Sequence, residues 1–107
     1  MLILKTTFLN LSLLFIFMGP YQAQKEAVII EGTVVAETTG KPVTNAHVYI
    51  LDGEEEALTN YKGEFSIMSW QKAPFKLTAE KHDGYEKTSI IITNPSVKQV
   101  IRLKVKS

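Results

Sequence analysis

The sequence predicts an all-β fold, a seven-stranded β-sandwich of the Greek-key type. Short runs rich in Val, Ile, Thr, Tyr and Phe alternate with turn residues at close spacing between Gly32 and Tyr85, a pattern typical of consecutive short strands. Beyond residue 23, no segment shows the apolar period of an amphipathic helix. Seven strands around one shared core favour two packed sheets, although the pattern also permits a closed barrel.

The expected strands follow one another with short connections. They span residues 27–37, 45–52, 57–59, 64–68, 75–79, 85–93 and 97–105. Successive residues of a strand point to opposite faces of its sheet, so alternation predicts which side chains face the core. The residues expected to point inward are Val28, Ile30, Gly32, Val34, Ala36, Phe65, Ile67, Phe75, Leu77, Ala79, Ile101, Leu103 and Val105. In the second strand, Ala46, Val48 and Ile50 share one face.

Glycine and proline mark the connections. In the turn at 38–42, Gly40 supplies a positive φ and Pro42 fixes the return of the chain. Gly32 differs because it lies inside a strand, where it leaves a gap on the core face that another strand or a large side chain can approach closely. The acidic run at 54–56 is expected to form a solvated loop.

The first segment of the chain differs in composition from the rest. Lys5 precedes an apolar stretch at 9–18, and Gly19-Pro20 and Ala23 follow it. A short basic region, about ten apolar residues and a small residue at the exit describe a secretory signal peptide. We therefore expect cleavage after Ala23.

This assignment gives two segments, a signal peptide at 1–23 and a β-sandwich domain at 24–107. The alternative is a retained membrane anchor, but the apolar stretch is shorter than the roughly 20 residues that span a bilayer. A lipid anchor would need a cysteine at the cleavage site, and the sequence has none. We expect no retained transmembrane segment and an exported protein, located in the periplasm, elsewhere in the cell envelope, or outside the cell.

Charge and cysteine content narrow the class of protein. The chain has 12 basic and 11 acidic side chains, and loss of Lys5 with the signal peptide leaves a net charge near zero. That balance argues against nucleic acid as a partner, which requires a clear basic excess. The absence of cysteine excludes a disulfide, and so small a domain is marginally stable without one. Either the core is well packed or a partner contributes stability.

Five short motifs occur in a fixed order along the expected sandwich. They are Gly32-Thr-Val34, Gly40-Lys-Pro42, Ala46-His-Val48, Thr59-Asn-Tyr-Lys-Gly-Glu-Phe65 and Gly84-Tyr85. Together they resemble the carboxypeptidase-regulatory-like domain, a prealbumin-like (transthyretin-like) seven-stranded β-sandwich, over about residues 28–104. One position departs from the family pattern, because Asn60 stands where the family usually has Asp; Asn also caps turns.

The resemblance implies a module without catalytic residues. Such domains accompany metallocarboxypeptidases as non-catalytic companions, stand at the N-termini of outer-membrane TonB-dependent receptors, and occur as short exported proteins in gram-negative envelopes. Transthyretin-related hydrolases share the architecture, but their multi-His/Arg site and C-terminal Tyr-Arg-Gly-Ser signature are missing from this sequence. We therefore expect no enzyme activity, since a fold alone does not confer one.

Two groups of side chains offer metal ligands, and in each the simpler interpretation is preferred. His47 and His82 have no neighbouring ligands in the sequence, so His82 is expected in a solvated turn and not in a zinc site. Asp52 and the carboxylates at 54–56 suit Ca²⁺, but consecutive residues of an extended chain alternate sides and do not converge. The sequence also lacks a Ser/His/Asp elbow and a Gly-rich phosphate loop. We expect no catalytic residue, no metal site and no cofactor.

Tyr61 and Trp70 are the candidate binding residues, with Tyr49 as a further exposed aromatic. If both lie at the same end of the sandwich, Tyr61 and Trp70 form a platform for a sugar or a peptide, because aromatic residues dominate binding hot spots. The competing interpretation is that Trp70 folds over the end of the sandwich and covers the core.

The expected function is that of a protein-binding or structural accessory module of the cell envelope, with an outer-membrane receptor or transporter as a candidate partner. An exposed edge strand offers binding by β-augmentation. The final strand, with Lys98, Arg102, Lys104 and Lys106, has a competing interpretation as edge protection, because charges discourage unwanted pairing. The alternative function is a small glycan-binding module that uses Trp70 and a tyrosine.

Overall fold

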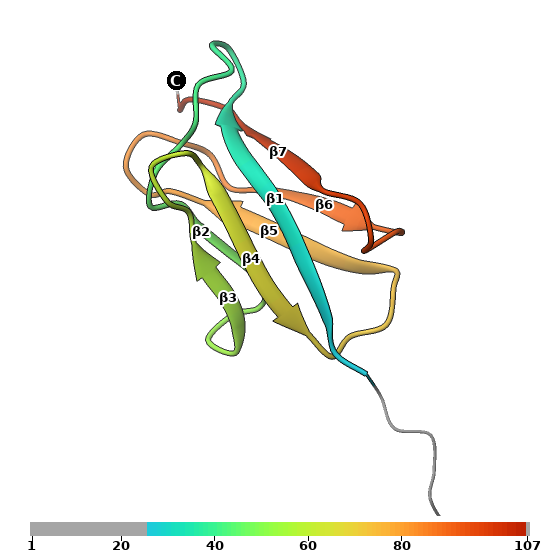
Figure 1. Ribbon diagram of the computed structural model, residues 1–107. Coiled ribbons are helices and arrows are strands. Elements are labelled where there is room, and N and C mark those ends of the chain that lie inside the picture. The colour runs from blue at the N-terminus through green and yellow to red at the C-terminus, as the bar shows by residue number, and fades with distance from the viewer. Residues whose placement is uncertain (1–25, 107) are drawn as a thin grey trace, which may run out of the picture.

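The computed structural model describes residues 26–106, so the predicted signal peptide lies outside the described residues. Seven strands form two sheets that pack face to face (Figure 1). In chain order they are β1 Val28–Ala36, β2 His47–Leu51, β3 Glu55–Leu58, β4 Glu64–Ser69, β5 Phe75–Glu80, β6 Thr88–Ile92 and β7 Gln99–Leu103. One sheet has the order β4-β1-β7 and the other β3-β2-β5-β6, which confirms the predicted sandwich and excludes the closed barrel.

The three-stranded sheet is built around β1. This strand pairs antiparallel with β4 along one edge and parallel with β7 along the other. In the four-stranded sheet every neighbouring pair is antiparallel. No helix in the described part of the chain is long and apolar enough to span a membrane.

The core lies between the two sheets, at the inward positions that strand alternation predicts. Its buried members are Ile30, Val34, Ala36, Val43, Ala46, Val48, Phe65, Ile67, Leu77, Ala79, Ile92, Ile101 and Leu103. Three further predicted residues, Val28, Ile50 and Phe75, are partly buried against them. The inward assignment of Val105 is wrong, since its side chain is 55% exposed. The reason is that β7 ends at Leu103, and Val105 joins only an isolated bridge to Tyr85.

Gly32 is the gap on the core face of β1 that the sequence predicts. It lies opposite Phe65 of β4 and Gln99 of β7. A Cβ atom at position 32 would lie 2.7 Å from the Phe65 Cζ and would collide with the Gln99 carbonyl oxygen. Both expected occupants, a neighbouring strand and a large side chain, fill the space.

Five strands begin one to three residues away from the predicted start, and two of these shifts, in β3 and β6, bear on the surface of the molecule. β3 begins at Glu55 and not at residue 57, so part of the expected acidic loop is a strand. β6 begins at Thr88 and not at residue 85, because residues 84–86 hydrogen bond to residues 104–106. There the Glu86 amide donates to the Lys104 carbonyl at 2.8 Å.

Candidate functional site

The longest motif, residues 59–65, connects β3 to β4, and its Thr59 serves the fold. The Thr59 hydroxyl donates to the Val43 carbonyl at 2.6 Å and accepts from the Ala46 amide at 2.8 Å. The side chain is buried, so these bonds fix the loop that leads into β2. Thr59 is therefore a structural residue and offers nothing to a ligand.

Asn60 organises the same turn. Its Oδ1 accepts hydrogen bonds from the amides of Lys62 and Glu64, each at 2.9 Å. Its Nδ2 donates to the Glu64 carboxylate at 3.2 Å. This last contact accounts for asparagine at this position, because an aspartate would bring a second negative charge against Glu64. Both roles of Asn60 are internal to the turn.

The two candidate binding residues lie at opposite ends of β4. Tyr61 precedes the strand and Trp70 follows it, and six residues at about 3.3 Å each put roughly 20 Å between them. They do not form a shared platform. Trp70 is half-exposed, and its side chain is not among the buried residues of the core. Each residue stays an individual candidate.

The outer face of the three-stranded sheet carries two exposed apolar side chains near the end of β4, the end that Trp70 follows. Ile29 of β1 lies directly opposite Met68 of β4, and both are exposed. Trp70 comes two residues after Met68, which places it on the same face. The alternation of residues 68–70 predicts from the sequence that Met68 and Trp70 share a face. That Ile29 lies opposite Met68 is known only from the register of the sheet.

Glu55 corrects the prediction of a solvated acidic loop. Its side chain is only 8% exposed and points toward the end of β4. The carboxylate accepts from the Ser69 hydroxyl at 2.7 Å and from the Trp70 amide at 3.0 Å. Burial raises the pKa of Glu55, but these bonds and one from Gln71 outweigh that effect and hold the pKa below its usual value. The ionised Glu55 carboxylate therefore links the two sheets, because it belongs to β3 and accepts hydrogen bonds from the end of β4.

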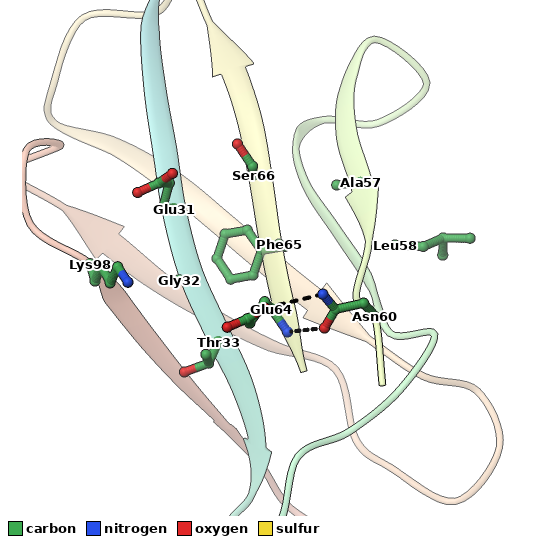
Figure 2. Close-up of a pocket in the computed structure, with 10 residues that line it drawn as sticks. All are labelled: Glu31, Gly32, Thr33, Ala57, Leu58, Asn60, Glu64, Phe65, Ser66 and Lys98. Atoms are coloured by element: carbon green, nitrogen blue, oxygen red, sulfur yellow. Dashed lines mark hydrogen bonds between the residues drawn. The ribbon is translucent and has the colours of Figure 1, made fainter. Parts of the chain in front are cut away.

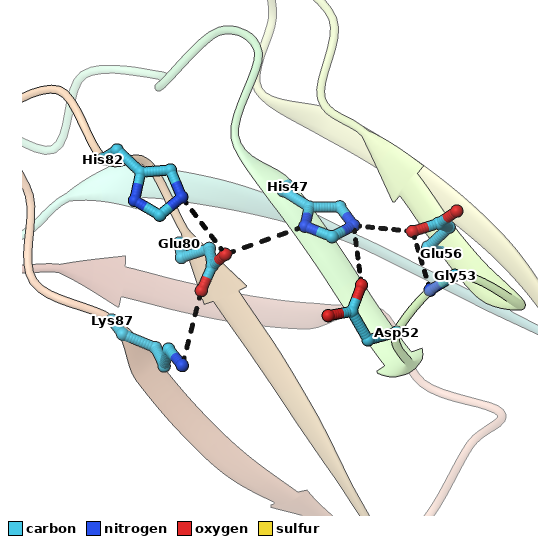
Figure 3. Close-up of polar contacts among 7 residues, drawn as sticks. All are labelled: His47, Asp52, Gly53, Glu56, Glu80, His82 and Lys87. Carbon is cyan, nitrogen blue, oxygen red and sulfur yellow. Dashed lines mark hydrogen bonds and ion pairs between the residues drawn. The ribbon is translucent and has the colours of Figure 1, made fainter.

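The outer face of the four-stranded sheet carries a cluster of ionisable side chains around His47 (Figure 3). The His47 Nε2 lies 2.7 Å from the Glu56 carboxylate and 3.9 Å from that of Asp52. On the other side of the ring, the His47 Nδ1 lies 3.8 Å from the Glu80 carboxylate. The Gly53 amide donates to the same Glu56 oxygen at 3.1 Å, so the β2–β3 turn orients that carboxylate. We call His47, Asp52, Glu56 and Glu80 the His47 cluster.

The charges of the cluster are unevenly balanced. Glu80 also faces two further basic side chains, with Lys87 Nζ and His82 Nε2 each 3.5 Å away. Asp52 and Glu56 form an ion pair with no residue of the described chain other than His47. The hydrogen bond from His47, followed by that from the Gly53 amide, lowers the pKa of Glu56. The neighbouring Tyr49 phenol and then the Glu80 carboxylate raise the pKa of Lys87.

Sequence reasoning did not find the His47 cluster, because strand register assembles it. His47 on β2 lies directly opposite Glu80 on β5. Tyr49 lies opposite Glu56 on β3, which makes Glu56 a diagonal neighbour of His47 on the same face. The outward position of His47 was readable from alternation, but the two pairings were not.

The described chain also has a hollow of about 450 Å³ beside β4 (Figure 2). It is lined by Glu31, Gly32, Thr33, Ala57, Leu58, Asn60, Glu64, Phe65, Ser66 and Lys98. Its hydroxyl groups have no histidine beside them, and Glu64 is bound to Asn60. Within residues 26–106, neither hydroxyl group of the lining, that of Thr33 or that of Ser66, hydrogen bonds to a carboxylate, lysine or histidine side chain.

These features define a small β-sandwich in which Thr59 and Asn60 of the longest motif stabilise the fold and the turn between β3 and β4. The chain matches the model of the CarboxypepD_reg-like domain over residues 30–107 and belongs to that family, as its motifs predict. It is also 44% identical over 46 residues to bacillopeptidase F of Bacillus subtilis (strain 168). That similarity covers 41% of this chain but only 3% of the length of bacillopeptidase F.

Proposed function

We propose that this protein is an exported, non-catalytic module that binds a partner protein of the cell envelope by strand addition at β6. Membership of the CarboxypepD_reg-like family supports a modular role. Export is part of the proposal and rests on the composition of residues 1–23. A receptor or transporter of the outer membrane is the class of partner that the family resemblance suggests.

One observation carries the choice of β6. Each sheet has two edge strands, and these are β4, β7, β3 and β6. In the described part of the chain, β3, β4 and β7 each contain a charged residue, whereas β6 reads Thr-Ser-Ile-Ile-Ile and contains none. Charges on an edge strand prevent pairing with other chains, so β6 is the edge that lacks this protection.

The backbone of β6 is open to a further strand. It pairs with β5 on one side, and its other side makes no backbone hydrogen bond within residues 26–106. The central Ile91 is 62% exposed on the outer face of the sheet. An extended partner segment would gain main-chain hydrogen bonds from this edge and an apolar contact from Ile91.

The geometry gives no support to a hydrolytic alternative. Within residues 26–106, the serine and threonine hydroxyl groups that form hydrogen bonds do so with the backbone, a carboxylate or one another, and none bonds to a histidine. A nucleophilic serine or threonine requires such a base within reach. Binding is therefore the activity that the described surface supports best.

The test compares two lysine substitutions in a pull-down from a solubilised envelope fraction, with the purified, tagged protein as bait. Ile91→Lys places a charge on the open edge and should abolish capture of the specific partner. Leu58→Lys is the matched control, because Leu58 is 64% exposed on the charged edge strand β3. Hydrogen exchange of the β6 amides should slow when the partner binds.

Two outcomes would count against the proposal. If Ile91→Lys captures the partner as well as the unmodified protein does, β6 is not the binding edge. If no specific protein is recovered with the unmodified protein, the adaptor role fails.

Glycan binding is the second candidate, and the exposure of Trp70 beside Ile29 and Met68 favours it. A sugar stacked on this surface would change the fluorescence of Trp70, the single tryptophan of the chain. Tyr61 is too distant to take part. Fluorescence that does not change across a panel of envelope glycans would remove this candidate.

A further inference from the structure

We propose that His47, Asp52 and Glu56 form a binding site for a divalent transition-metal ion such as Zn²⁺. The three side chains come from β2, the β2–β3 turn and β3, and they point toward one another on the outer face of the sheet (Figure 3). One donor atom from each lies within 4.8 Å of the other two. The site is distinct from the open edge of β6.

The distances between the three donor side chains fit a metal ion that the protein coordinates from one side, with its other side open to solvent. Zinc lies about 2.0–2.2 Å from imidazole nitrogen and carboxylate oxygen, so two ligands of a tetrahedral site are about 3.4 Å apart. The His47 Nε2 lies 2.7 Å from Glu56 and 3.9 Å from Asp52, which brackets that separation. Small rotations of two exposed carboxylates would equalise the distances. Water or a further ligand would complete the coordination.

The donor set selects the class of ion. One imidazole nitrogen with two carboxylates suits Zn²⁺ and its neighbours, whereas Ca²⁺ takes oxygen ligands alone. The calcium interpretation needs Asp52 together with the acidic run at 54–56, but Glu55 points into the interior and is bonded to Ser69. The side chains that come together are instead Asp52, Glu56 and a histidine from the preceding strand, His47.

The surroundings of His47 support ligation through Nε2. Metal-bound histidines usually donate their other ring nitrogen to a carboxylate, which fixes the tautomer and the orientation of the ring. Glu80 lies on that side, with its carboxylate 3.8 Å from Nδ1, so a small movement of either side chain would bring the two within hydrogen-bond distance. Its own charge is balanced by Lys87, whereas a neutral His47 leaves Asp52 and Glu56 without a cation in the described chain. A divalent ion would supply the missing positive charge.

Isothermal titration of the purified protein with ZnCl₂ at neutral pH tests the proposal. We expect saturable binding of one ion per chain. His47→Gln should abolish it, and Asp52→Asn should weaken it by about tenfold or more, on the scale that even outer-shell changes produce. Asp52→Asn is the cleaner variant, because the Asp52 side chain is 71% exposed and its one ion pair within residues 26–106 is the long contact with His47, so the melting temperature without metal should not change.

The matched control is His82→Gln. His82 is also an exposed histidine that faces Glu80, but it lies outside the three-residue set, so its loss should change zinc affinity by less than about twofold. The proposal is overturned if the unmodified protein shows no saturable zinc binding. It is equally overturned if His82→Gln weakens binding as much as His47→Gln does, or if His47→Gln binds Zn²⁺ as the unmodified protein does.

Discussion

The side chain of Glu55 carries a charge into the junction between the two sheets. Its carboxylate joins β3 to the end of β4 through the Ser69 hydroxyl and the Trp70 amide. In Glu55→Gln, an NH₂ group replaces one of the two carboxylate oxygens. That NH₂ group would then face a hydrogen-bond donor, either the Ser69 hydroxyl or the Trp70 amide. We expect a loss of about 1–3 kcal/mol in the free energy of unfolding, measured by urea denaturation. The adjacent Glu54→Gln is the control and should change it by less than about 0.5 kcal/mol.

The same residue gives a prediction for pH. Because hydrogen bonds lower the pKa of Glu55 in the folded state, its stabilising contribution is present above the unfolded pKa of about 4.5. The contribution is lost as the pH falls through the lower, folded value. The stability difference between the unmodified protein and Glu55→Gln, measured in chelator, should be constant from pH 7 to pH 5 and shrink below about pH 4.5. A difference that grows on acidification would contradict the assignment.

Gly32 shows how a missing side chain determines the packing of three strands. In Gly32→Ala the new methyl group would meet the Phe65 ring and the Gln99 carbonyl. The ring can move, but the carbonyl belongs to the paired backbone of β7, so the strands must separate. We expect destabilisation of about 3 kcal/mol in urea denaturation.

Gly40→Ala is the comparison for Gly32→Ala. Gly40 has a φ of 74°, but no atom lies within 4 Å of the position that the new methyl group would occupy, so only the left-handed backbone opposes the change. That cost is about 1–2 kcal/mol. Equal destabilisation by the two variants would show that the close approach at Gly32 is not what matters.

At the level of elements, the turn at 59–65 explains why the sequence tolerates asparagine at position 60. Asn60→Ala removes the acceptor for two amides and should lower stability by about 1–2 kcal/mol. Asn60→Asp keeps both acceptor bonds and replaces the bond to Glu64 by a repulsion between exposed carboxylates, so its cost should stay below about 1 kcal/mol. Thermal melting of the two variants at neutral pH measures the difference. An aspartate variant that is less stable than the alanine variant would contradict this role for the acceptor oxygen.

The sequence predicts elements whose causes are local. Strand alternation, the missing side chain at Gly32 and the turn around Asn60 each depend on a single residue or on residues a few positions apart, and the structure confirms all three. The sequence predicts a solvated loop at Glu55 because the groups that bind its carboxylate lie 14 and 15 residues away in the chain. The His47 cluster was missed for the same reason, since its members meet only through the register of three strands.

At the level of the whole molecule, the parallel pairing of β1 with β7 joins the two ends of the described domain. Residues 32–36 pair with residues 99–103, so the three-stranded sheet is incomplete until the last strand is in place. Without a disulfide, this pairing and the core beneath it must hold the two ends together. The fold should therefore be lost as one unit, and not strand by strand.

Paired substitutions in β7 test this cooperativity. Ile101 is fully buried, and Ile101→Ala should lower the free energy of unfolding by about 2–5 kcal/mol. Its neighbour Val100 is 51% exposed on the opposite face, so Val100→Ala should change it by less than about 0.5 kcal/mol. Trp70 lies on a different strand connection, and its fluorescence in urea should give the same midpoint as far-UV circular dichroism in both variants. Separate midpoints in Ile101→Ala would mean that β7 detaches alone and that the rest of the sandwich is stable without it.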